Sequence, residues 1–186
     1  MSAKENLREM LLEKSVRTGD FTLASGKKSD LYVDCRLTAL DNRGAGWIGE
    51  VGWELVKGRL EAENFEIDAI GGMTMGADPI SLVVGMASAG DENALQVFNI
   101  RKEPKGYGRG KQIEGNFKEG DKVVVVDDVI TTGGSTLKAI EAIRAGGGEV
   151  IFCLVLVDRE EGGRAAIEAE GVPVLSIFTR RELLGS

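Results

Sequence analysis

The sequence predicts an α/β fold: a parallel sheet flanked by helices, with a small hood made of an N-terminal helix and a hairpin. Two segments carry this prediction, VVVVDD (123–128) and VIFCLVLVD (150–158). Their uninterrupted apolar runs indicate strands that are buried on both faces. A helical pattern follows each of them, and strands that alternate with helices are typical of a parallel sheet.

The other elements follow from the same patterns. Residues 4–16 place their apolar side chains on one side, as an amphipathic helix does. Segments 21–25 and 30–35 flank a Gly-Lys-Lys turn and predict a short antiparallel pair. The core is then expected to contain a helix at 43–61, strands at 67–72, 95–100, 123–128, 150–158 and 173–178, helices near 77–89, 134–145 and 163–170, and a long polar loop at 101–119.

Size and composition limit the class of protein. The 186 residues suit a single domain, with the hood at about 1–40 and the α/β core at about 41–186. No apolar run approaches the ~20 residues that span a bilayer, and the charged first helix does not resemble a signal peptide. Cys35 and Cys153 are expected to be core thiols and not a disulfide. We therefore expect a cytoplasmic protein without membrane contacts.

Charge and residue usage exclude several kinds of chemistry. The chain contains no histidine, which excludes a Ser-His-Asp triad, a histidine general base and histidine metal sites. Its net charge of −7 argues against binding to the nucleic acid backbone, so no nucleic acid partner is expected. Catalysis would have to use carboxylates, lysines, arginines, hydroxyls or a bound metal.

The strongest functional motif is VVVVDDVITTGGST (123–136). Asp127 and Asp128 stand at the end of a buried strand, and hydroxyls, two glycines and a helix start follow them. The unpaired N–H groups and partial positive charge of a helix N-terminus, with these hydroxyls, predict a monophosphate cradle. The carboxylates suit ribose hydroxyls or the water shell of Mg²⁺. A helix cap alone explains one hydroxyl, and an ATPase would need a Walker A sequence, which is absent.

A second motif is the cationic segment RKEPKGYGRGKQIEGN (101–116). Between Arg101 and Lys111 it holds five basic residues and one acidic residue, a local charge of +4. Glycines interleave with the charges and predict a mobile flap. Such a flap would neutralise charge that develops on a leaving group and would exclude water. The alternative is an ordinary solvated surface loop.

A third motif, GAGWIG (44–49), matches the dinucleotide fingerprint GxGxxG. The preceding residues are polar where a buried strand should end, and the bulky Trp47 lies inside the motif. We therefore interpret these glycines as close packing contacts on a helix.

The motifs together resemble a known family. Segment 123–136 resembles the motif with which type I phosphoribosyltransferases bind 5-phosphoribosyl-1-pyrophosphate (PRPP), and the cationic segment resembles the catalytic loop of orotate phosphoribosyltransferases. The hairpin FTLASGKKSDLYVDCR (21–36), the loop GGMTMGADPI (71–80) and DREEGG (158–163) resemble further segments of that family. Many members have lysine where this chain has Ala24 and near Met75, and histidine at Tyr107; Lys27 or Lys28 is expected to replace the first of these.

The resemblance implies the roles of individual residues. Arg101, Lys102 and Lys105 are the implied catalytic residues, which contact pyrophosphate. The implied orotate-binding residues are Thr131, Arg159 and Lys27, and the implied PRPP-binding residues are Arg101, Lys102, Lys105, Tyr107, Asp127, Asp128, Val129, Ile130, Thr131, Thr132, Gly133, Gly134 and Ser135.

The resemblance also implies the reaction and its partners. Ribose 5-phosphate would pass from PRPP to orotate, giving orotidine 5′-phosphate and pyrophosphate in pyrimidine (UMP) biosynthesis. Mg²⁺ would be held through PRPP and water near Asp127 and Asp128, without a direct protein ligand. The implied assembly is a homodimer with shared active sites. Two alternatives stay open: a phosphoribosyltransferase for another base such as a purine, and a non-catalytic regulator that senses PRPP.

Overall fold

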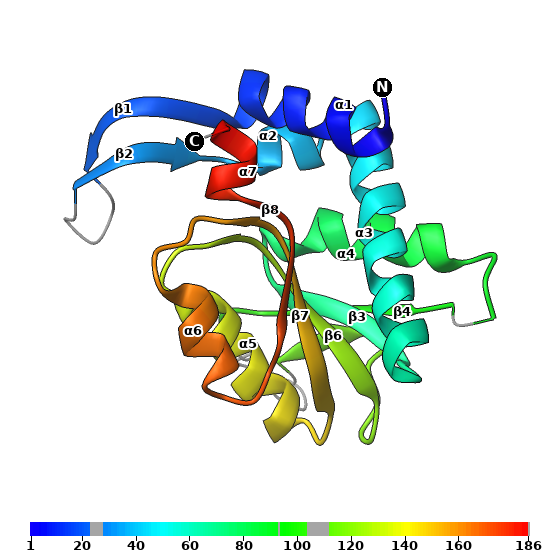
Figure 1. The fold of residues 1–186 in the computed structure, drawn as a ribbon. Coiled ribbons are helices and arrows are strands. Elements are labelled where there is room, and N and C mark those ends of the chain that lie inside the picture. Colours follow the sequence, from blue (N-terminus) through cyan, green and yellow to red (C-terminus); the bar gives the residue numbers. More distant parts are fainter. Residues whose placement is uncertain (23–27, 93, 104–111, 186) are drawn as a thin grey trace.

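A six-stranded sheet forms the centre of the molecule in this computed structural model, which describes residues 1–22, 28–92, 94–103 and 112–185 (Figure 1). The strand order is β5-β4-β3-β6-β7-β8, and only β5 runs antiparallel to its neighbour. The strands are β3 (Ala69–Met73), β4 (Gln96–Ile100), β5 (Ile113–Gly115), β6 (Lys122–Ile130), β7 (Glu149–Asp158) and β8 (Val174–Thr179).

Side chains of the central strands alternate between two cores. Val124 and Val126 of β6 pack into the core beneath α3 (Asn42–Glu63) and α4 (Ala77–Ser88). Val123 and Val125 pack into the core beneath α5 (Gly134–Ala145) and α6 (Gly163–Glu168). The sheet is therefore covered on both faces (Figure 1), which explains why β6 has no polar residue between Val123 and Val126.

The hood combines the two ends of the chain. Helix α1 (Ala3–Met10) continues into a π-helical turn (Leu11–Ser15), and β1 (Val16–Thr22) pairs antiparallel with β2 (Lys28–Val33). Short helix α2 (Arg36–Ala39) follows, and the C-terminal helix α7 (Arg180–Leu184) lies against this assembly (Figure 1). Arg180 pairs with Asp30 of β2 at 2.7 Å, and Arg8 Nε donates to the Glu182 carbonyl at 2.9 Å.

The predicted α/β fold and its hood are confirmed, with local corrections. The segment 101–119 is not only a loop, because β5 pairs with β4 at the sheet edge. The first strand of the hairpin begins at Val16 and not at residue 21, and the helix predicted at 4–16 is α-helical to Met10 and π-helical from Leu11 to Ser15. Helices α2 and α7 are additional elements. Within the described ranges, no helix is both long and apolar enough to cross a membrane.

The GAGWIG motif lies inside helix α3. A Cβ on Gly49 would come within 2.7 Å of the Val83 carbonyl oxygen of α4, and one on Gly44 within 2.3 Å of the Thr38 carbonyl oxygen. A Cβ on Gly46 would meet no atom within 4 Å among the described residues outside its own stretch of helix. The prediction of close packing is thus confirmed for Gly44 and Gly49, and it is wrong for Gly46.

Candidate active site

A pocket of about 340 Å³ opens at the carboxyl ends of the parallel strands. This is the edge at which ligands bind in open α/β sheets. Residues from the hood, from the loop after β3, from the end of β4 and from the β6–α5 region surround it: Tyr32, Val33, Asp34, Arg36, Met73, Thr74, Met75, Gly76, Lys102, Asp127, Asp128 and Ser135.

The predicted acidic pair lies in the floor of this pocket. Asp127 is only 7% exposed; its Oδ2 accepts a hydrogen bond from Thr136 Oγ1 at 2.6 Å, and its Oδ1 accepts one from Asp128 N at 3.0 Å. Burial raises the pKa of Asp127 to about 7, opposed by the Thr136 hydrogen bond and reinforced by the Asp128 charge. Burial also raises the pKa of Asp128. A ligand that brings hydroxyl donors or positive charge would favour the ionised forms.

The loop after β3 owes its position beside this pair to glycines. A Cβ on Gly72 would approach the Val126 carbonyl oxygen to 2.0 Å, and one on Gly76 would lie 2.5 Å from Asp128 Oδ1. Any larger residue would displace the loop or the carboxylate. The two glycines, Gly72 at the end of β3 and Gly76 in the loop after it, therefore let this stretch of backbone close one side of the pocket.

The predicted phosphate cradle contains the backbone N–H groups at the start of α5, which have no partner within the helix. Gly133 adopts a left-handed φ of 81°, which glycine tolerates best, and α5 begins directly after it without a side-chain cap among the described residues. Thr132, Gly134 and Ser135 are exposed. Because the first N–H groups of a helix have no partner within it, an anion is the kind of ligand that suits this place.

Other residues of the same motif have different surroundings. The Thr136 hydroxyl is buried on Asp127, so this fourth hydroxyl supports the acid instead of facing the pocket. Ile130 is 1% exposed in one core, and Val129 packs against the other. A ligand would therefore contact Val129 and Ile130 through their backbone.

The cationic segment leaves the sheet beside the pocket. Lys102 lines the pocket directly, whereas the exposed Arg101 lies 3.7 Å from Glu114 of β5. Arg101 N donates to the Gln112 carbonyl at 2.9 Å, so the segment starts and returns at one place on the sheet edge. Lys105, Tyr107, Lys27 and Ala24 lie outside the described residues.

Arg159 lies next to the cradle and outside the described pocket wall. Its side chain is 4% exposed, and Nη2 is 2.5 Å from Glu161 Oε1. Its backbone N–H donates to the Ile130 carbonyl at 3.0 Å. The charge of Arg159 also contributes to the lowered pKa of Asp30 in β2, after the larger effect of Arg180. Arg159 thus lies between the cradle and the hood, and its contact with orotate stays a prediction.

Two charged residues of the pocket, Asp34 and Arg36, were not assigned a role from the sequence. Arg36 lines the pocket and makes two 2.8 Å hydrogen bonds to Asp34, from Nε and Nη2. Its charge also opposes the rise in the Asp128 pKa. Arg36 is the last residue of the hairpin segment singled out above, but its chain position alone does not reveal that it faces the acidic pair.

Known proteins share both the sequence and the fold. The sequence pattern of the phosphoribosyl transferase domain matches residues 87–174. The orotate phosphoribosyltransferase of Aquifex aeolicus is 45% identical over 187 residues, which cover 99% of each chain. The chain belongs to the orotate phosphoribosyltransferase family. The family member from Rhodopirellula baltica is 43% identical and covers 91% of this chain and 88% of its own.

Solved structures agree with this assignment. The orotate phosphoribosyltransferase of Mycobacterium tuberculosis H37Rv in complex with PRPP has a TM-score of 0.79 and 32% identity, over 98% of this chain and 99% of that one. Adenine phosphoribosyltransferase from Saccharomyces cerevisiae has a TM-score of 0.67 at 17% identity over 94% of this chain and 99% of that one, and shares the fold alone. The similarity to the family therefore extends over the hood as well as over the acidic pair and the cradle.

We predict that Asp127→Asn flattens the pH dependence of stability. The folded-state pKa of Asp127, about 7, exceeds the ordinary value of 3.8, so its contribution is greatest at low pH and is lost as the pH rises through 7. For the wild type we expect a loss on the order of 2 kcal/mol in unfolding free energy between about pH 5 and pH 8. Without histidine, few other groups titrate in this window.

Urea unfolding at several pH values provides the measurement. In Asp127→Asn the amide oxygen can accept from Asp128 N and the amide nitrogen can donate to Thr136 Oγ1, which reverses that hydroxyl bond, and the amide cannot ionise. Equal slopes of stability against pH in the wild type and the variant would contradict the raised pKa.

Proposed function

We propose that the chain transfers ribose 5-phosphate from PRPP to orotate and releases pyrophosphate, forming orotidine 5′-phosphate for pyrimidine synthesis. The observation that carries this proposal is the meeting of an acidic pair, an open helix N-terminus and a lysine in one pocket. Family membership at 45% identity over nearly the whole chain adds the choice of base.

The pocket suggests how PRPP lies. Its 5′-phosphate would bind the free N–H groups and hydroxyls of 131–135, as anions do at helix N-termini. The ribose hydroxyls would then donate to Asp127 and Asp128, whose buried carboxylates need such donors. Lys102 faces the same pocket, on the side where the pyrophosphate would lie.

A divalent cation fits this arrangement as a companion of the substrate. The described residues contain no group of three or more acidic, cysteine or histidine side chains that could hold a metal. Carboxylate oxygens are nevertheless suitable partners for the water shell of Mg²⁺. We therefore propose that Mg²⁺ is held through PRPP and water near Asp127 and Asp128. When bound, it would neutralise part of the diphosphate charge.

The chain's own residues would mainly stabilise the charge on the departing pyrophosphate and orient orotate. As the bond from C1′ to the pyrophosphate oxygen loosens toward an oxocarbenium-like state, Arg101, Lys102 and Lys105 would stabilise the departing negative charge. Removal of one such donor typically costs about 10²–10³ in rate. Orotate would attack through its ring nitrogen, oriented by Arg159, Thr131 and Lys27. Because orotate is itself acidic, no strong general base is required, in agreement with a chain that lacks histidine.

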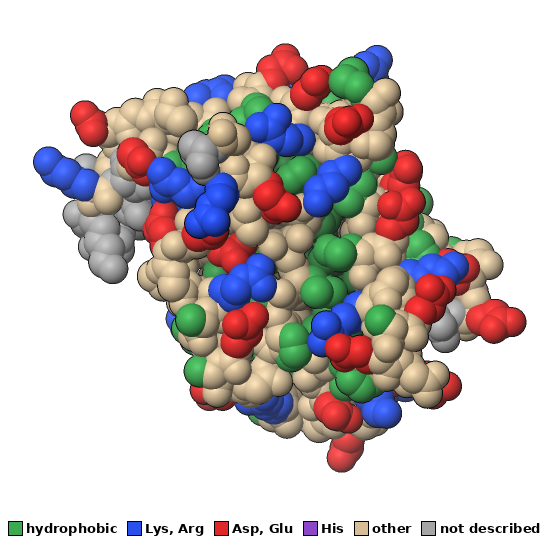
Figure 2. All heavy atoms as spheres, in the orientation of Figure 1, with side chains coloured by type: hydrophobic (Ala, Val, Ile, Leu, Met, Phe, Trp, Pro, Cys, Tyr) green, Lys and Arg blue, Asp and Glu red, His purple; other side chains and the backbone are tan. Residues whose placement is uncertain are grey.

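We also propose a homodimer with shared sites. Large hydrophobic side chains are exposed on and beside α2 and α4, and Leu40, Leu82, Pro79 and Val97 line an apolar groove there of about 420 Å³. Met75 and Arg36 line both this groove and the active-site pocket. A second copy that covers the groove would therefore sit at the rim of the site. The face shown in Figure 2 carries interspersed acidic and basic side chains with a strip of hydrophobic side chains between them.

The proposal includes a cytoplasmic location. Both cysteines, Cys35 and Cys153, are free and buried, which agrees with a reducing compartment.

An activity assay tests base choice. With PRPP and Mg²⁺, we predict loss of the ultraviolet absorbance of orotate, and no comparable turnover of adenine, guanine, hypoxanthine or uracil. Excess EDTA should abolish the reaction, and added Mg²⁺ should restore it. Faster turnover of hypoxanthine or guanine than of orotate would refute the assigned substrate. Full activity in EDTA would refute the role of the metal.

A mixing experiment tests the shared site. Lys105→Ala lacks the charge of the flap, and the double variant Asp127→Ala, Asp128→Ala lacks the acidic pair, so each alone should be nearly inactive. If the flap serves the neighbouring subunit, heterodimers have one complete site, and random mixing restores up to about a quarter of wild-type activity. If heterodimers form and no activity returns, the flap serves its own subunit.

A further inference from the structure

The turn between β7 and α6 packs directly on the backbone of the phosphate cradle. Its two ends are hydrogen-bonded to the β6 end: Arg159 N to the Ile130 carbonyl at 3.0 Å, and Gly163 N to the Thr131 carbonyl at 2.9 Å. A Cβ on Gly163 would come within 2.6 Å of the Thr131 carbonyl oxygen and 2.8 Å of Gly133 N. The path of this turn and the shape of the cradle therefore depend on each other.

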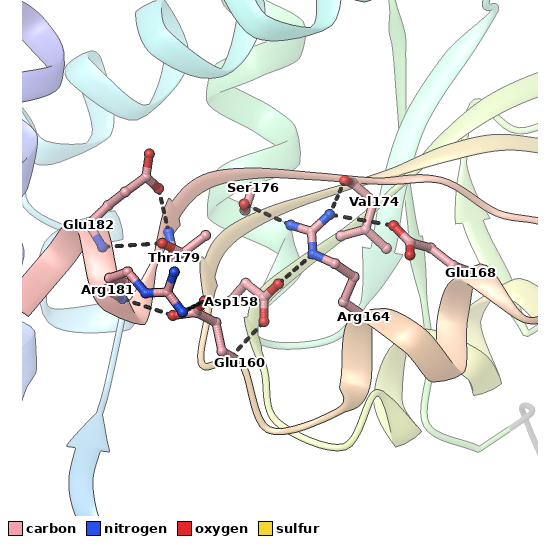
Figure 3. Close-up of polar contacts among 9 residues, drawn as sticks. All are labelled: Asp158, Glu160, Arg164, Glu168, Val174, Ser176, Thr179, Arg181 and Glu182. Carbon is pink, nitrogen blue, oxygen red and sulfur yellow. Dashed lines mark hydrogen bonds and ion pairs between the residues drawn. The ribbon is translucent and has the colours of Figure 1, made fainter. Parts of the chain in front are cut away.

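An ion pair between the buried Asp158 and the partly exposed Arg164 holds the turn from the opposite side (Figure 3). Asp158 is 1% exposed; its Oδ2 accepts from Arg164 Nε at 2.8 Å, and its Oδ1 accepts from Glu160 N at 2.9 Å. The Arg164 guanidinium also donates to the Val174 carbonyl and, at 2.9 Å, to Ser176 Oγ of β8. One planar guanidinium thus joins β7, β8 and the start of α6, a geometry that lysine cannot reproduce.

The same turn is tied to the hood. Glu160 has a left-handed φ of 56°, and its Oε2 accepts from Arg181 N of α7 at 3.0 Å (Figure 3). The neighbouring Arg180 pairs with Asp30 of β2 at 2.7 Å. A single short turn therefore connects the cradle on one side with the hairpin on the other, and it carries Arg159 between them.

We propose that Asp158 and Arg164 are positioning residues of the active site. They hold the 159–163 turn against the Thr131–Ser135 cradle, and in this way they set the affinity for the phosphate group and the direction of Arg159. Neither residue belongs to the described pocket wall, so they act through the turn and not on the substrate. The inference rests on the proposed function, in which the cradle binds the 5′-phosphate of PRPP.

The test compares Arg164→Met with a matched control, Arg144→Met. Arg144 likewise binds an acid and a carbonyl, with Nη1 3.3 Å from Glu170 Oε2 and Nη2 donating to the Glu170 carbonyl at 2.8 Å, but it lies in the last turn of α5. We expect Arg164→Met to raise the KM for PRPP about 10-fold, because small displacements of positioning groups have large effects. Its kcat should change less. The control should lower only the thermal midpoint, and Arg164→Lys should recover part of the lost affinity.

Gly163→Ala provides an independent perturbation of the same contact. Its added Cβ would lie 2.3 Å from Ile130 Cγ2, so it should displace the cradle and raise the KM for PRPP while the Asp158–Arg164 pair is intact. If Arg164→Met does not fold, Gly163→Ala and Arg164→Lys decide the question. A wild-type KM for PRPP in the folded variants would overturn the proposal and leave the pair a purely structural role.

Equilibrium binding of inorganic phosphate separates this inference from the proposed function. If the wild type did not convert orotate and PRPP, the proposed function would fail. Weaker phosphate binding by Arg164→Met and Gly163→Ala, but not by Arg144→Met, would still support the positioning role. Unchanged phosphate affinity in all variants would contradict it.

Discussion

The site depends on one constraint, the placement of two adjacent carboxylates where a fully buried strand reaches the pocket. Strand β6 is apolar on both faces through Val126, and the next residue is a carboxylate that remains 7% exposed. Ionisation is costly in such a place unless hydrogen bonds or positive charge compensate. Thr136 supplies one hydrogen bond, and the pKa of Asp127 nevertheless remains at about 7. In the proposed function, the ribose hydroxyls and Mg²⁺ would supply the remaining donors and positive charge at this strand end.

The surrounding backbone adapts to that strand end. Gly72 lets β3 approach Val126 of β6, Gly76 lets the loop after β3 approach Asp128, and Gly163 lets the turn after β7 approach the cradle. On both sides of β6, a glycine without a side chain allows the segment that follows the neighbouring strand to contact the end of β6. The Asp158–Arg164 pair then fixes the outer side of this arrangement. The glycine-rich motifs after different strands are consequently parts of one packed unit.

Sequence patterns predict the features that depend on local chemistry. The apolar runs of β6 and β7 require burial on both faces, and the acids, hydroxyls and glycines after β6 identify the cradle. By contrast, β5 has no apolar run and exists through backbone pairing with β4, which leaves no mark in its residues. Arg36 reaches the pocket because the hood folds over the sheet, and Arg164 reaches Ser176 because β8 lies beside β7. Such long-range contacts are set by tertiary packing and have no periodic signal. The roles expected of Lys105, Tyr107 and Lys27 concern residues outside the described ranges.

The central claim is that the β6 end and the α5 start form one binding unit for PRPP. A crystal structure of the chain with PRPP and Mg²⁺ tests it most directly. The account predicts that the 5′-phosphate lies within hydrogen-bonding distance of the backbone N–H groups of residues 131–135, with the ribose hydroxyls on Asp127 and Asp128. A 5′-phosphate bound away from this turn, or a ribose that does not contact the acidic pair, would contradict it.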